Sequence, residues 1–297
     1  MDPIYVIDRA TGKKFQEQVF GEKALNILYG PLLGRLLAHL ISRISIFSYL
    51  YGLWQNMSFT KKAIPPFIHA YNIDSSEFRL PVSEFTSFND FFIRKLKHES
   101  RPIDSAADTA IIPADGRYRF FQNMGEVDGF VVKGEKFDLS KLLGDEKLSR
   151  HYTNGSMVMA RLCPVDYHRF HFPVNCVPGP SKLINGYLYS VNPIAVKKNI
   201  HIFSQNKRMI TELDSPEFGK VLFIEIGATN VGTINQTFEA NFPYKKGEEK
   251  GYFSFGGSAL ILLFEPNRIK FDRDLTNQSD YEILCKMGTR MGLMLKT

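Results

Sequence analysis

Ser258 is the residue of this sequence that is best placed to react with the backbone. It follows Gly256 and Gly257 inside an apolar, aromatic run, residues 251–264, at the head of the last forty residues. Gly257 leaves its own carbonyl sterically open, so a deprotonated Ser258 hydroxyl could attack it and convert the amide into a labile ester. The sequence therefore predicts that the chain can break between Gly257 and Ser258. The alternative is that Gly-Gly-Ser only forms a tight turn or a β-bulge.

Two further motifs supply groups that could act on this serine. Asp115 lies in a Pro-Ala-Asp-Gly turn between two predicted strands, where an aspartate usually serves turn geometry. His168 and His171 lie in an aromatic segment that is bracketed by prolines and is too short for a comfortable helix. On a regular strand these two histidines would face opposite sides. A carboxylate, an imidazole and a hydroxyl are the groups of a charge relay, although either histidine could instead be structural.

Taken in order along the chain, these segments resemble the phosphatidylserine decarboxylases, a family of self-processing, pyruvoyl-dependent enzymes. The resemblance covers most of the chain from Tyr5 onward. Its motifs lie at residues 88–96 (Phe-Asn-Asp-Phe-Phe-Ile-Arg-Lys-Leu), 101–103, 113–116, 132–134, 142–144, 166–171 (Asp-Tyr-His-Arg-Phe-His) and 255–258 (Phe-Gly-Gly-Ser). No single motif is persuasive by itself, since Asp-Gly and Gly-Gly-Ser are common, whereas the ordered set is highly specific.

The resemblance implies a role for each reactive group. Ser258 would be the nucleophile of self-cleavage and the precursor of a covalent pyruvoyl group. His171 would be its general base, and Asp115 the carboxylate that orients His171. His168 is the candidate proton donor of the decarboxylation step. Ala259 stands where many members of the family carry Ser or Thr, which removes a hydroxyl contact next to the cut.

The implied chemistry makes its own cofactor. Once the ester has formed, loss of the Ser258 Cα proton leaves a dehydroalanine, which hydrolyses to a pyruvoyl group and releases ammonia. This ketone forms a Schiff base with the amine of the phosphoserine head group and accepts electrons as carbon dioxide leaves. The resemblance thus implies conversion of phosphatidylserine to phosphatidylethanolamine without metal or pyridoxal phosphate. The large chain, 1–257, and the small chain, 258–297, would form a heterodimer, which could pair into a dimer of heterodimers.

Composition is typical of a mostly globular enzyme. The 297 residues are 44% hydrophobic and 23% charged, enough chain for one large or two modest domains. Cys163, Cys176 and Cys285 have no Cys-x-x-Cys spacing, so we expect neither a disulfide framework nor a structural zinc site. His-Glu-x-x-His is absent as well, and we expect no metal.

The net charge of +6 favours an anionic partner, and its distribution favours a membrane surface over nucleic acid. No Asp or Glu occurs in residues 23–73, a segment rich in Leu, Ile, Phe and Tyr. The longest uncharged piece, residues 44–60, is shorter than the about 20 apolar residues that a membrane-spanning helix needs. We therefore expect helices that lie in the interface. The alternative is that these helices pack on the protein's own core or on a second subunit.

The candidate membrane-binding residues belong to this segment. At helical spacing, Arg35 and Arg43 fall on a polar stripe, while Leu36 and Leu40 fall on the apolar remainder. Trp54 follows as an aromatic residue of the kind found at membrane interfaces. The N-terminus lacks the features of a secretory signal. We expect a peripheral protein on the cytoplasmic side of the cell membrane.

The expected fold class is α+β. A helical, membrane-associated N-terminal region, residues 1–100, precedes a β-rich catalytic core, residues 101–297. Within the first region we expect a strand or hairpin near residues 5–20, helices over about 21–71 and a short helix around 88–96. Beyond residue 101, short β-rich runs are separated by Gly, Pro, Asn and Asp.

Three other functions fit part of this pattern. A pyruvoyl decarboxylase of a soluble amino acid would use the same site but has no evident need of the basic, apolar N-terminal region. A serine hydrolase would use Asp115, His171 and Ser258, although Gly-x-Ser-x-Gly is absent. A non-catalytic membrane-binding protein would keep the bond between Gly257 and Ser258 intact.

Overall fold

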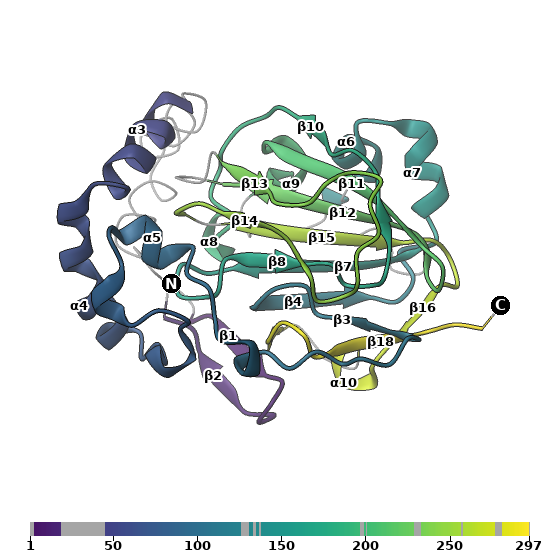
Figure 1. Cartoon of the computed structure of the whole chain (residues 1–297). Coiled ribbons are helices and arrows are strands. Elements are labelled where there is room, and N and C mark those ends of the chain that lie inside the picture. Colours follow the sequence, from purple (N-terminus) through teal and green to yellow (C-terminus); the bar gives the residue numbers. More distant parts are fainter. Residues whose placement is uncertain are drawn as a thin grey trace.

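The computed structural model describes residues 3–18, 45–125, 131–132, 135–136, 138–196, 199, 201–228, 233–256, 258–276 and 281–296. Within them, one large ten-stranded sheet forms the centre of the molecule (Figure 1). Its strands are β1 (Tyr5–Asp8), β2 (Lys14–Gln16), β4 (Gly116–Phe121), β7 (Ser156–Leu162), β9 (Val177–Pro178), β10 (Lys182–Ile184), β11 (Arg208–Ser215), β12 (Gly219–Gly227), β15 (Ser258–Phe264) and β17 (Glu282–Cys285). They follow the order β10-β11-β12-β15-β7-β4-β17-β1-β2, with β9 also paired to β11.

Smaller sheets complete the β structure of these residues. One contains β13 (Ile234–Gln236), β14 (Glu249–Phe253) and β8 (Arg169–His171). A second contains β16 (Ile269–Phe271), β18 (Arg290–Met294) and β3 (Thr109–Ile111). A short pair is formed by β5 (Val131–Val132) and β6 (Glu135–Lys136).

Short helices lie around the sheets. The α-helices are α3 (Ser45–Gln55), α4 (Ile64–Ala70), α5 (Phe88–Phe92), α6 (Leu139–Leu143), α7 (Glu146–Tyr152), α8 (Pro193–Val196), α9 (Ile202–Gln205) and α10 (Arg273–Thr276). The 3-10 helices are η1 (Ser58–Ala63), η2 (Ser75–Glu77), η3 (Val82–Glu84) and η4 (His98–Ser100). Figure 1 shows α3, α4 and α5 together on one side of the sheets. None of the helices in the described part of the chain combines the length and apolar character that spanning a membrane requires.

Local capping fixes where three of the short α-helices begin and where one of them ends. Asp138 and Asp145 stand before α6 and α7, and each side chain accepts a backbone N–H of the first turn. Gly144 ends α6 with φ +61°, a left-handed conformation that glycine adopts without a steric penalty. Ser87 caps α5 by accepting the N–H of Asp90 at 3.1 Å. Each segment is therefore too brief to be stable alone and depends on packing against the sheets.

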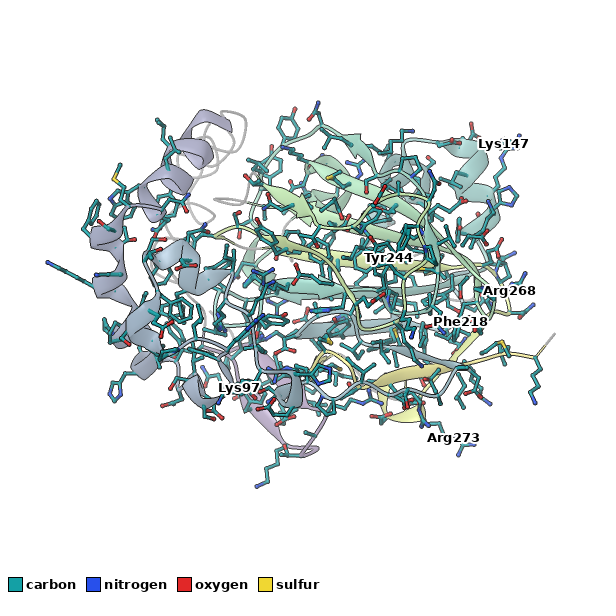
Figure 2. All side chains as sticks on the ribbon, in the orientation of Figure 1. Lys97, Lys147, Phe218, Tyr244, Arg268 and Arg273 are labelled. Carbon is teal, nitrogen blue, oxygen red and sulfur yellow. The ribbon has the colours of Figure 1, made fainter. Side chains whose placement is uncertain are left out.

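Strand β15 lies in the middle of the large sheet, between β12 and β7, and all seven of its residues are buried. Leu260 and Leu262 pack into the core that includes Phe170 and Phe253 of the smaller sheet, while Ile261 packs into a second core on the opposite face. Both faces of the strand are thus covered, which explains its unbroken apolar sequence. Figure 2 shows the described side chains as sticks on the ribbon.

A separate group of buried residues, here named the aromatic cluster, joins the N-terminal helices to the core. Its members are Ile64, Phe67, Phe78, Phe85, Phe88, Phe91, Phe92 and Phe255. Phe255 comes from the loop between β14 and β15, so this loop is packed against α4 and α5 rather than against the large sheet. The cluster fixes the N-terminal helices beside the residues that precede Ser258.

The α+β fold class and its β-rich character are confirmed by this architecture. A hairpin near the N-terminus is present as β1 and β2, but β1 pairs in parallel with β17. Residues 5–16 therefore belong to the sheet of the core, although the predicted division at residue 100 places them in the N-terminal region. The short helix expected over 88–96 ends earlier, at Phe92.

Candidate active site

Ser258 is the first residue of β15, and it is fully buried. The strand pairs Ser258 with Gly227 of β12 on one side and with Leu162 of β7 on the other. Its Oγ lies 3.4 Å from Nδ1 of His168, a long contact for a hydrogen bond. A buried hydroxyl is thereby held at the start of a central strand and faces an imidazole.

His168 presents its unprotonated nitrogen to Ser258. Its Nε2 lies 2.9 Å from the carbonyl oxygen of Cys163, which can only accept a hydrogen bond, so Nε2 carries the proton and Nδ1 is the acceptor. The ring stacks on Phe92 with centroids 3.9 Å apart. Burial lowers the pKa of His168 to about 3, and the positive charges of Arg94 and Arg117 add to the decrease. His168 is therefore a neutral imidazole at neutral pH.

His171 is the last residue of β8, and its surroundings differ. Its Nδ1 lies 2.9 Å from the carbonyl oxygen of Gly247, so Nδ1 carries the proton and Nε2 accepts from the Tyr167 hydroxyl at 3.2 Å. Burial lowers the pKa of His171 to about 4; the carboxylates of Glu249 and Asp115 oppose this shift, and the guanidinium of Arg169 adds to it. His171 is thus also neutral, but carboxylates lie close enough to stabilise its charged form.

Asp115 lies in the turn before β4, and its carboxylate is held by two groups. Arg101 donates from Nε at 2.9 Å, and the backbone N–H of Met287 donates at 2.9 Å. Within the described residues, neither Asp115 nor Ser258 is hydrogen bonded to His171. The structure therefore brings Ser258 together with His168, and it leaves Asp115 as an electrostatic neighbour of His171.

A buried ionic network that the sequence analysis missed supports the loop before His168. Asp166 accepts from the Arg117 guanidinium and, at 2.6 Å, from the N–H of Cys163. Glu17 accepts from Arg161 at 2.9 Å and lies beside Arg117. Burial would raise the pKa of Glu17, but Arg161 and Arg117 hold it below the ordinary value. The network fixes the Cys163 carbonyl, and with it the tautomer of His168.

Arg101 is the other functional residue whose role sequence reasoning missed. It lies inside one of the quoted motifs, but no partner was assigned to it. Besides Asp115, its guanidinium contacts Glu77 at 2.9 Å. The signal that the sequence offers is an arginine and an aspartate, 14 positions apart, in two neighbouring motifs.

The structure describes only some of the remaining predicted residues. Trp54 is 45% exposed, and it lies among other exposed apolar side chains: Leu50, Leu53, Met57 and Phe59. Gly257, Arg35, Leu36, Leu40 and Arg43 lie outside the described residues. Among the residues that the structure covers, no group of three or more His, Cys, Asp or Glu side chains is arranged to hold a metal ion.

Ser258 thus follows two glycines in the sequence, heads a central strand and faces a neutral histidine, which places a base beside a buried nucleophilic hydroxyl. The family model described as phosphatidylserine decarboxylase matches residues 88–293. The chain therefore belongs to the phosphatidylserine decarboxylase family, which consists of carboxy-lyases.

Relatives extend the match over almost the whole chain. The phosphatidylserine decarboxylase proenzyme of Chlamydia pneumoniae is 50% identical over 288 residues, 96% of either chain. Those of Chlamydia caviae and Chlamydia felis are 49% and 47% identical and cover 100% and 99% of either chain. Among solved structures, the glucose permease IIA of Mycoplasma capricolum aligns with a TM-score of 0.28 and 10% identity, over 62% of this chain and 93% of that one, too low a score to assign a fold.

Proposed function

We propose that this chain is made as a precursor, breaks between Gly257 and Ser258, and decarboxylates phosphatidylserine with a pyruvoyl group derived from Ser258. Membership of the phosphatidylserine decarboxylase family supports the decarboxylation reaction. The observation that supports the pyruvoyl cofactor is the position of Ser258, which is buried at the start of β15 and contacts His168. The pyruvoyl group supplies an electron sink for the carbon that loses carbon dioxide. Its precursor is already fixed by strand pairing on both sides.

His171 and Asp115 are assigned to self-cleavage. The base that removes the Ser258 proton must carry a positive charge while the hydroxyl attacks the carbonyl of Gly257. The carboxylates of Asp115 and Glu249 favour that charge on His171, whereas Arg94 and Arg117 oppose it on His168. Since Ser258 contacts His168 in the arrangement described, cleavage requires that Ser258 and His171 approach each other and that His171 Nε2 release the Tyr167 hydroxyl.

His168 is assigned to decarboxylation. Its neutral Nδ1 faces the position of Ser258, so it can accept a proton from the ammonium group of the incoming substrate. The same nitrogen can return that proton to the carbon from which carbon dioxide has left. His168 thus begins and ends the cycle uncharged. Between the two steps it carries a positive charge, which Arg94 and Arg117 disfavour and which the negatively charged substrate would offset once bound.

The two chains are expected to remain together after cleavage. The small chain would contain β15, β16, β17 and β18. Strand β15 lies between β12 and β7, and β17 lies between β4 and β1, so both are flanked by strands of the large chain. This interleaving supports a heterodimer.

The membrane-bound part of the proposal rests on α3 and η1. Five apolar side chains on these two helices and at the junction between them expose between 45% and 52% of their surface: Leu50, Leu53, Trp54, Met57 and Phe59. Lys61 and Lys62 follow in the last turn of η1. Apolar side chains beside lysines suit an anionic lipid surface. We assign the protein to a peripheral position on the cytoplasmic side of the cell membrane.

Intact mass under denaturing conditions tests the proposal. We expect a fragment of residues 258–297 that is lighter by one ammonia than hydrolysis alone predicts, and a Ser258→Ala variant that stays uncleaved. A fragment with an ordinary serine terminus would contradict the pyruvoyl cofactor. The purified enzyme should then release carbon dioxide from phosphatidylserine in mixed micelles but not from free serine; the opposite preference would favour a decarboxylase of soluble amino acids.

A further inference from the structure

The loop that precedes Ser258 is anchored at Phe255. The backbone N–H of Phe255 donates to Oδ1 of Asn89 at 2.9 Å, and both residues are buried. Gly256 follows with φ +139°, a conformation that residues with side chains rarely adopt. Ser258 is already held in β15. Two glycines therefore connect two fixed points on either side of the bond that is proposed to break.

Asn89 also connects this anchor to α3. Its Nδ2 donates to Oδ1 of Asn56 at 2.9 Å, and Nδ2 of Asn56 donates to the carbonyl of Gly52 in α3 at 3.0 Å. Both ends of this chain of bonds are backbone groups of fixed character, an N–H at Phe255 and a carbonyl at Gly52. The Phe255 N–H requires an oxygen from Asn89, and the Gly52 carbonyl requires an N–H from Asn56. The orientation of both side-chain amides is therefore determined.

The ring of Phe255 reinforces the same connection. It lies 5.7 Å from the ring of Tyr51 in α3, 5.2 Å from Phe88 and 4.8 Å from Phe92. Phe92 in turn stacks on His168. The Phe255 ring thus contacts α3 directly, whereas the Phe255 backbone is linked to α3 through Asn89 and Asn56.

We propose that Asn89 is a positioning residue for self-cleavage, which holds the loop before Ser258 in register with the active site and, through Asn56, ties it to α3. This inference depends on the proposed self-cleavage. Asn89 touches Phe255 and Asn56 rather than the reacting groups, so it acts through the conformation of the loop. Loss of its side-chain oxygen leaves a buried N–H without an acceptor, which favours other conformations of the two glycines.

Paired variants test this role through the rate of self-cleavage, measured by intact mass after cell-free synthesis. Asn89→Ala should slow cleavage by at least about fivefold, because the Phe255 N–H loses its acceptor. Asn89→Asp keeps that acceptor, so cleavage should be faster than in Asn89→Ala. It should stay below the wild-type rate, because the carboxylate cannot donate to Oδ1 of Asn56, whose amide is oriented by the Gly52 carbonyl. Asn56→Ala should have a smaller effect than Asn89→Ala.

Asn123→Ala is the matched control. The side-chain oxygen of Asn123 also accepts one backbone N–H, that of Gly125 at 2.9 Å, but Asn123 follows β4 at the end of the sheet away from Ser258. This variant should cleave at the wild-type rate. Urea unfolding of each variant in the Ser258→Ala background shows whether the substitutions change stability equally.

Three outcomes would overturn the inference: wild-type cleavage in Asn89→Ala, equal slowing in Asn89→Ala and Asn89→Asp, or equal slowing in Asn123→Ala. In each of them the wild-type chain still matures and acts on phosphatidylserine, so the proposed function stands. A wild-type chain that never cleaves would instead end both proposals.

Discussion

The surroundings of His168 and of His171 differ although the two residues are separated by only two positions. His168 is stacked on a phenylalanine ring, donates to a backbone carbonyl and has arginines as its charged neighbours. His171 contacts a tyrosine hydroxyl and has the carboxylates of Asp115 and Glu249 nearby, together with Arg169. Both rings are neutral, but only one has the surroundings that stabilise a transient positive charge. Two identical side chains can thus be specialised by their neighbours.

Replacing each histidine separately should have the largest effect on the rates of self-cleavage and decarboxylation. We expect His171→Ala to slow self-cleavage by about a thousandfold, because the base is lost. His168→Ala should still yield the cleaved chains but should lose decarboxylation by a similar factor. Intact mass gives the first rate, and carbon dioxide release per pyruvoyl group gives the second. If His168→Ala instead stays uncleaved while His171→Ala matures, the contact seen between Ser258 and His168 identifies the base and our assignment is wrong.

Removal of the negative charge beside His171 should have a smaller effect. Asp115→Asn keeps the shape of the side chain but cannot stabilise a charged His171, so self-cleavage should slow by about a hundredfold. Decarboxylation by the fraction that matures should change little. Glu282→Gln offers a control, since it removes a carboxylate that pairs with Arg161 rather than one that lies beside His171. Equal slowing in both variants would indicate a general loss of stability.

Acid should destabilise the fold through both histidines. Their pKa values are about 3 and about 4 in the folded chain and near 6.5 when unfolded, so the unfolded chain binds more protons between pH 6.5 and 4. The free energy of unfolding therefore falls as the pH drops through this range. In the Ser258→Ala background, His168→Phe should reduce the loss between pH 7 and pH 5 by about 2 kcal/mol. Urea unfolding at the two pH values measures it; an unchanged loss would mean that His168 is not buried as a neutral ring.

Removal of the Tyr167 hydroxyl should have the smallest effect on the rate of self-cleavage. Since it occupies Nε2 of His171, Tyr167→Phe should free that nitrogen and speed self-cleavage by about two- to fivefold. The initial rate of chain breakage after cell-free synthesis is the measurement. A slower rate would show that the hydroxyl helps to carry the proton from Ser258 to His171.

Sequence patterns predicted those features of the fold that are determined by residues close together in the sequence. The apolar run around residues 251–264 became β14 and β15, separated by a loop with Gly256, because alternating and continuous apolar residues favour strands. These features require only local spacing and burial.

The contacts of the site could not be predicted in this way. Glu17 and Arg161 meet although they are 144 positions apart, and β1 pairs with β17 from the other end of the chain. Nothing in the spacing of the histidines indicated which of them would face Ser258, because His168 precedes β8 and is not held to the alternation of a strand. Such contacts depend on how distant strands are arranged, which one sequence does not encode locally.

The central position of β15 has a consequence for how long the enzyme survives. Before cleavage, an unfolded molecule can refold as one chain, and the covalent link keeps β15 near β12 and β7. After cleavage, the strand belongs to a separate forty-residue piece, and refolding becomes an encounter between two molecules. The mature protein would then depend on slow unfolding rather than on reversible stability. A mature molecule would then lose its activity once the large sheet unfolds, because its two chains would have to find each other again.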